Sequence, residues 1–135
     1  NRTIRSVKEV KVGNEPKTFV ELDSDISESQ FTKVFREDEF VFNAPHEYRI
    51  TNSETNETID TINFQKGPLK ENPLNGIFIE DLLAICVDRL AHFQKSEFSC
   101  RENAVALTKI EEAMMWLYKR KNNRVRRGVQ GYNQK

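Results

Sequence analysis

The apolar positions follow a different period in each half of the chain. In the first half, short runs alternate weakly between apolar and polar residues, which predicts β-strands at Thr3–Val12, Lys17–Leu22 and Glu39–Phe42. The polar segment Ser24–Lys33 carries a poor signal, and both a loop and a short helix fit it. The N-terminal half is therefore expected to form a small antiparallel β-sheet.

The clearest strand signal is a β-hairpin in the middle of the chain. Glu47–Thr51 and Thr58–Phe64 alternate with period two, and the six residues between them are all polar. One face of this hairpin is expected to be buried, with a shift of register near Ile59. The candidate residues for that face are Tyr48, Ile50, Ile59, Ile62 and Phe64.

The second half has the helical period. Apolar residues recur at three- and four-residue spacing through Ile79–Gln94, which predicts a first helix. A capping box of Ser99 and Glu102 opens a second helix, which is expected to run from Asn103 to about Arg124 and to stop at Gly128.

Only Lys95–Glu97 separate the two predicted helices, so we expect an antiparallel helical hairpin. Gly-Pro, Asn-Pro and Asn-Gly pairs punctuate a linker before it. The fold class is thus α+β, with residues 1–135 as a single domain: a β-rich part at 1–72, the hairpin at 76–127 and a tail at 128–135.

The second predicted helix contains a belt of five consecutive apolar residues, Ala113–Leu117. At 100° per residue these side chains point in every direction around the helix, so all sides must be covered. The sheet could wrap the belt completely. A chain this short builds little core, however, and we favour burial against a second copy, which predicts a homo-oligomer.

The net charge of the chain is zero, but its basic residues are concentrated at the C-terminal end. The chain holds 21 Lys and Arg against 21 Asp and Glu, a balance that argues against coating nucleic acid by bulk charge. Seven bases and no acid lie between Lys119 and Lys135, which leaves the rest of the chain with 14 bases, 21 acids and a net charge of −7. Such an end is either a solvated tail or a local site for an anion.

Catalytic and metal-binding patterns are absent from the sequence. There is no glycine-rich phosphate loop and no nucleophile elbow, and His46 and His92 do not stand at metal-ligand spacing with the two cysteines. A Cys100–His92 nucleophile pair has no other support. We therefore expect a binding protein that is not an enzyme and that carries no cofactor or metal.

The best candidate chemistry combines arginines with aromatic rings. Arg120, Arg124 and Arg127 are spaced to share one helix face, where guanidinium groups can grip phosphate and stack on purines. Trp116, Tyr118 and Tyr132 lie nearby in sequence, and Phe93 ends the first helix. Asn103, on the first turn of the second helix, could read a base or ribose edge. This set suits a small phosphodiester with an adenine base.

Residues 76–135 resemble a known family, above all through the run Cys100–Ala113. This part is similar to the helical hairpin domain shared by phage anti-CBASS and Thoeris anti-defence proteins, which are cyclic-nucleotide sponges. Phe64–Glu71, Asn75-Gly76 and the segment 127–131 resemble the Thoeris-type branch, which adds an N-terminal sheet. The similarity extends from about His46 to the C-terminus, and residues 1–40 resemble nothing we recognise.

The resemblance implies a function. It implies a non-enzymatic protein of the host bacterial cytoplasm that sequesters immune messengers, namely glyco-cyclic ADP-ribose isomers and also cyclic di- and trinucleotides, in a homohexamer built from dimers and trimers. It also implies a ligand pocket with an aromatic ring, an Asn and two Arg, at the positions of Phe93, Asn103, Arg120 and Arg124. For a second, trinucleotide pocket it suggests Arg101 and Thr108. Tyr132 departs from the family tail, where Thr is common.

Two other functions fit the residues less well. The basic C-terminal segment could make the chain a nucleic-acid-binding adaptor, with binding that depends on salt. A phosphodiesterase that degrades the same messenger is the enzymatic alternative.

Overall fold

The structure is a computed structural model that describes residues 7–12, 15–26 and 28–128. The chain divides into two compact units, Asn1–Lys66 and Gly67–Lys135, which we call the sheet unit and the helical unit. Their boundary falls at the start of the predicted linker. The α+β class predicted from the sequence is confirmed.

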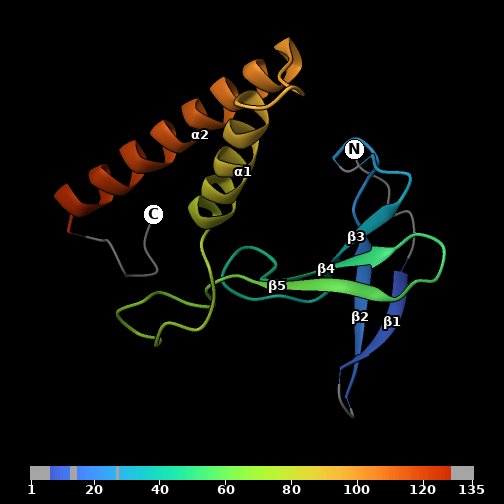
Figure 1. Ribbon diagram of the computed structural model, residues 1–135. Coiled ribbons are helices and arrows are strands. Elements are labelled where there is room, and N and C mark those ends of the chain that lie inside the picture. The colour runs from blue at the N-terminus through green and yellow to red at the C-terminus, as the bar shows by residue number, and fades with distance from the viewer. Residues whose placement is uncertain (1–6, 13–14, 27, 129–135) are drawn as a thin grey trace. The chain divides into compact units, whose positions relative to one another are not determined.

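The sheet unit is a five-stranded antiparallel sheet in which each strand pairs with the next one along the chain (Figure 1). The strands predicted at Thr3–Val12, Lys17–Leu22, Glu47–Thr51 and Thr58–Phe64 are confirmed to within a few residues, except that Thr3–Ser6 lie outside the described residues. The strands are β1 Val7–Val12, β2 Glu15–Glu21, β3 Thr32–Glu37, β4 Glu47–Asn52 and β5 Thr58–Asn63.

The third strand does not lie where the sequence predicted it. Glu39–Phe42 is not a strand: it lies in a turn where Phe42 and Asn43 have positive φ angles of 56° and 76°. Two contacts hold that turn. The Arg36 guanidinium lies over the Phe40 ring, and a His46 ring nitrogen lies 2.7 Å from the Val41 carbonyl oxygen. The strand itself begins at Thr32, within the segment predicted as loop or helix.

The β4–β5 hairpin agrees with the prediction, including the irregular register. Ile50 pairs with Asp60 and Thr51 with Thr58, so Ile59 is the extra residue of a β-bulge. Ile59 is 60% exposed, so it does not belong to the buried face on which it was placed. The other four residues of that predicted face are half-buried: Tyr48, Ile50, Ile62 and Phe64.

The best-buried side chains lie mainly on the opposite face of the sheet. Phe19 is fully buried and Phe35 nearly so, and the strand register places both on the face that also holds Glu37 and Arg49. Lys17 Nζ and the Arg49 guanidinium lie 5.7 Å and 4.9 Å from the centre of the Phe19 ring. The aliphatic stems of charged residues therefore help to cover this core.

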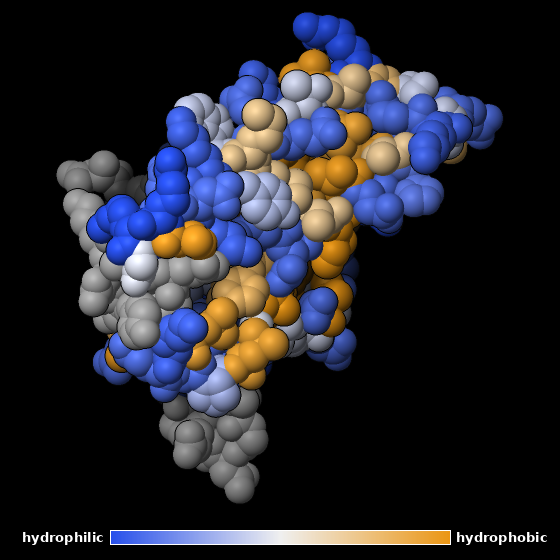
Figure 2. Space-filling model, turned by 90° about the vertical axis from the view of Figure 1, so that its left-hand side faces the viewer, coloured by the Kyte–Doolittle hydropathy of each residue, from blue (hydrophilic) through white to orange (hydrophobic). Residues whose placement is uncertain are grey.

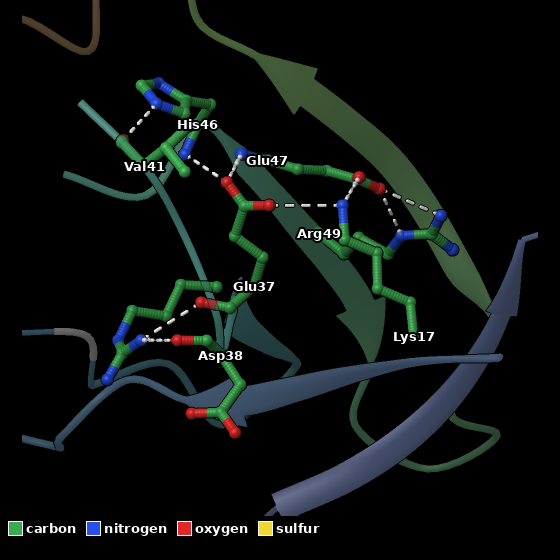
Figure 3. Close-up of polar contacts among 8 residues, drawn as sticks. Lys17, Glu37, Asp38, Val41, His46, Glu47 and Arg49 are labelled. Carbon is green, nitrogen blue, oxygen red and sulfur yellow. Dashed lines mark hydrogen bonds and ion pairs between the residues drawn. The ribbon is translucent and has the colours of Figure 1, made fainter. Parts of the chain in front are cut away.

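A charge network crosses the same face (Figure 3). Glu37, only 6% exposed, accepts hydrogen bonds from the backbone N–H groups of His46 and Glu47 at 2.5 Å and 3.1 Å. Lys17 Nζ bridges Glu37 at 3.1 Å and Glu47 at 2.7 Å, and Arg49 donates twice to Glu47. Burial raises the pKa of each glutamate, but these hydrogen bonds outweigh it and leave both pKa values below the usual range.

The helical unit consists of α1 Ile79–Gln94 and α2 Arg101–Arg126, which pack against each other as the predicted hairpin. The Phe78 N–H donates to Asp81 at the start of α1. At the start of α2 the expected Ser99 capping box is wrong, because Cys100 is the N-cap residue and its Sγ accepts from the Asn103 N–H. Gly128, with φ of 72°, ends α2 as predicted.

Candidate functional site

The three arginines predicted to bind a ligand meet in one groove at the C-terminal end of α2. This open groove, of about 320 Å³, is lined by Trp116, Lys119, Arg120, Asn123, Arg124 and Arg127. The residues recur every three or four positions, so they form one face of the helix. Trp116 belongs to the arginine–aromatic set named from the sequence, whereas Lys119 and Asn123 do not, although the same spacing would have placed them there.

The groove is strongly cationic. It holds four bases, and no Asp or Glu stands between Ala113 and the end of the chain. Intrahelical ion pairs form between residues three or four apart, and no Asp or Glu stands at those distances from Lys119 or Arg120 within α2. The groove therefore offers charge-assisted hydrogen bonds to a phosphate.

Asn103 and Phe93 lie at the other end of the hairpin, beside the turn between the helices. Phe93 is 38% exposed, and the Arg89 guanidinium lies 5.2 Å from the centre of its ring. The turn is held by two hydrogen bonds of 3.1 Å between the Gln94 side chain and the backbone of Cys100. This end thus presents an aromatic ring beside a cation on a well-tied turn.

One chain does not bring the two ends together. Asn103 and Arg120 lie on the same helix, α2, and 17 residues at 1.5 Å each separate them by about 26 Å. Successive stacked nucleotides rise by only about 3.4 Å, so a mono- or dinucleotide does not reach from one end to the other. A pocket that uses Phe93 and Asn103 together with Arg120 and Arg124 needs two chains.

The remaining predicted residues are separate from the groove. Arg101 and Thr108 are exposed on the first half of α2, and their spacing of seven residues puts them on one face. They do not line the groove. Tyr132 lies outside the described residues.

The helices leave much apolar surface uncovered. Neither α1 nor α2 contains a fully buried residue. Within the predicted apolar belt, Met114 and Leu117 are half-buried, whereas Met115 and Trp116 are 69% and 61% exposed. Figure 2 shows hydrophobic side chains, in orange, reaching the molecular surface between hydrophilic ones. The oligomer expected from the belt stays a prediction.

Within the described residues, no three side chains of the metal-binding types form a cluster that could hold an ion. Cys86 and Cys100 are exposed and free. The His92 ring contacts Asp88, and the Cys100 Sγ accepts a hydrogen bond from the Asn103 N–H. The described contacts of these two side chains therefore do not pair Cys100 with His92 as a nucleophile and its base. No described helix combines the length and hydropathy needed to span a bilayer.

Comparison with known proteins places the chain in a family. Residues 56–121, which include α1 and most of α2, match the family described as Acb2/Tad1, hairpin domain. The chain is also 39% identical over 140 aligned residues to Thoeris anti-defense 1 of Bacillus phage SBSphiJ7, with 85% of this chain and 99% of that protein covered. The chain belongs to the Acb2/Tad1 family. Membership in the Acb2/Tad1 family confirms the resemblance inferred from the Cys100–Ala113 run, and the alignment with the phage protein, which covers 85% of the chain, extends it to residues before His46.

Proposed function

We propose that this protein is a phage anti-defence sponge. It binds a cyclic-nucleotide immune messenger inside the host bacterium and holds it intact, so that the effector of the defence system is not activated. The preferred ligands are glyco-cyclic ADP-ribose isomers, and cyclic di- and trinucleotides are further candidates. Family membership and the 39% identity to a Thoeris anti-defence protein support this role.

The observation that carries the proposal is the cationic groove on α2. Three arginines and a lysine line it together with an exposed tryptophan ring and an amide, Asn123. A pyrophosphate needs charged donors, and an adenine needs a flat apolar surface. The groove offers both within about three turns of one helix.

The second half of the pocket comes from another chain. Asn103 lies about 26 Å from Arg120 along α2, and Phe93 lies at the same end of the hairpin as Asn103, so these two residues complete a pocket only when the turn of one hairpin meets the α2 end of a second. The exposed Met115 and Trp116 offer apolar surface for such a contact. This supports the homo-oligomer, for which the proposed hexamer is the form that the family resemblance implies.

Sequestration needs affinity rather than chemistry. Nanomolar binding corresponds to about −12 kcal/mol. Charge-assisted hydrogen bonds contribute about 1.5–3 kcal/mol each and base stacking about 1–3 kcal/mol. Two arginines and two aromatic rings therefore supply a large part of the required energy. Arg101 and Thr108 are proposed for a separate trinucleotide site.

The test is thermal unfolding with a panel of cyclic nucleotides, followed by heat denaturation and identification of the released ligand. We expect glyco-cyclic ADP-ribose at 100 times its dissociation constant to stabilise the fold by about 2.7 kcal/mol. It should then be recovered unchanged. Phe93→Ala combined with Arg124→Ala should abolish the shift, whereas Lys121→Ala, outside the groove, should keep it. A degraded ligand would instead show a phosphodiesterase.

The same groove favours one other function, a nucleic-acid-binding adaptor. Contacts from the lysine and arginine side chains of the groove to phosphates would give an affinity for DNA or RNA that falls steeply as the salt concentration rises. Binding of this kind, lost on deleting residues 119–135 and accompanied by no response to cyclic nucleotides, would replace the sponge proposal.

A further inference from the structure

The only tryptophan of the chain carries a cation on one face of its ring. Lys119 Nζ lies 4.9 Å from the centre of the Trp116 ring, and the Trp116 side chain is 61% exposed. Both residues line the groove that holds Arg120, Arg124 and Arg127. The ammonium therefore occupies part of the flat surface that a base would need.

The position of Lys119 follows from the charges around it. No acidic residue stands three or four positions from it on α2, and its groove neighbours are cations. The electron-rich face of the ring is the best available partner for the ammonium under these conditions. This attraction is weak at an exposed site, whereas a charge-assisted bond to phosphate is strong, so an arriving phosphate outcompetes the ring.

We propose that Lys119 and Trp116 form an exchangeable pair that couples phosphate recognition to base stacking. Lys119 covers the ring while the groove is empty. When the pyrophosphate of the ligand enters between the arginines, the ammonium moves to a phosphate oxygen and the ring face stacks on the adenine. This inference rests on the proposed function and adds two ligand-binding residues to the same pocket.

The exchange makes the groove selective for ligands that carry both groups. Inorganic pyrophosphate would draw Lys119 away but leave the ring bare. Adenosine would have to displace the ammonium without offering it a better partner. A messenger that joins adenine to a pyrophosphate satisfies both residues at once, so its affinity exceeds what either fragment predicts.

Tryptophan emission tests the proposal directly, because Trp116 is the only tryptophan. The full chain is titrated at fixed protein concentration with glyco-cyclic ADP-ribose, inorganic pyrophosphate and adenosine, and binding is measured in parallel by calorimetry. We expect saturable emission changes with the first two ligands, at the same midpoints as calorimetry, and none with adenosine at equal concentration. Lys119→Gln should weaken binding of the cyclic ligand about tenfold, or about 1.4 kcal/mol.

Lys121→Gln is the matched control, since Lys121 is an exposed lysine on the same helix that does not line the groove, and it should bind as the unmodified protein does. Calorimetric binding that leaves the emission unchanged, or that Lys119→Gln does not weaken, would overturn this inference and leave the sponge intact. Absence of calorimetric binding by any cyclic nucleotide in the panel would overturn both.

Discussion

The charge network of the sheet unit gives a quantitative prediction for Glu37→Gln. Glu37 is 6% exposed, and its carboxylate accepts two backbone N–H groups and pairs with Lys17 (Figure 3). A glutamine keeps one oxygen for the two N–H groups but turns an NH₂ group towards the Lys17 ammonium. The substitution therefore removes the charge from two hydrogen bonds and places a donor against a donor.

The expected cost follows from those contacts. A hydrogen bond to a charged group contributes about 1.5–3 kcal/mol and a neutral one about 0.5–1.5 kcal/mol, so each of the two retained bonds loses about 1 kcal/mol. The lost Lys17 contact adds less, because the lysine side chain is 38% exposed and its charge is screened by water. We expect the free energy of unfolding of the sheet to fall by about 2–3 kcal/mol in total.

Amide hydrogen exchange is the assay, since the sole tryptophan lies outside the sheet unit. The His46 and Glu47 amides bond to the Glu37 carboxylate, and they should exchange about 30- to 150-fold faster in Glu37→Gln. Glu54→Gln, at an exposed position in the β4–β5 turn, is the control and should leave both rates unchanged. Exchange rates of these two amides within twofold of those in the unmodified protein would refute the view that the Glu37 carboxylate stabilises the segment between β3 and β4.

Two further predictions concern pH and backbone geometry. Folding lowers the pKa values of Glu37 and Glu47, so the stability that they contribute is complete above the usual glutamate pKa of 4.5 and is lost as the pH falls below it. Acid unfolding followed by circular dichroism should therefore begin below pH 4.5, and stability should fall less steeply with pH in Glu37→Gln. An equally steep fall in the variant would contradict the lowered pKa of Glu37. Gly67→Ala should lower the melting temperature more than Gly128→Ala. Both glycines have positive φ, but a Cβ at Gly67 would lie 2.6 Å from Asn72 Cγ, whereas at Gly128 nothing lies within 4 Å. Equal losses would show that Asn72 moves aside.

The elements in which apolar residues repeat at a regular spacing could be predicted from the sequence. The two helices and the β4–β5 hairpin were found because apolar residues repeat at one spacing along each of them. β3 was missed because its buried positions include the charged Glu37, which a pattern of apolar residues treats as exposed. The core around Phe19 was not predicted for the same reason, since the charged residues Lys17 and Arg49 help to cover its ring.

The site was predictable in part. Helical spacing places Arg120, Arg124 and Arg127 on one face, and the structure brings them into one groove. The same rule extends to Lys119 and Asn123. Cys100 as the N-cap of α2 was not foreseen, because a thiol is an uncommon capping group. The separation of Phe93 from the arginines follows from helix length, whereas the second chain that we propose for the pocket cannot be placed by any periodic pattern in the sequence.

The central claim is that an intact messenger is held in a pocket built from two chains, and mixing two inactive variants tests it most directly. Phe93→Ala damages only the turn end and Arg124→Ala only the groove end, so each alone should hold no messenger. If the two are unfolded together and refolded as an equal mixture, random assembly should restore about a quarter of the pockets. We predict that about a quarter of the normal amount of intact ligand per chain is then recovered on denaturation. Recovery of no ligand from the mixture, while the unmodified protein refolds and binds, would contradict the account.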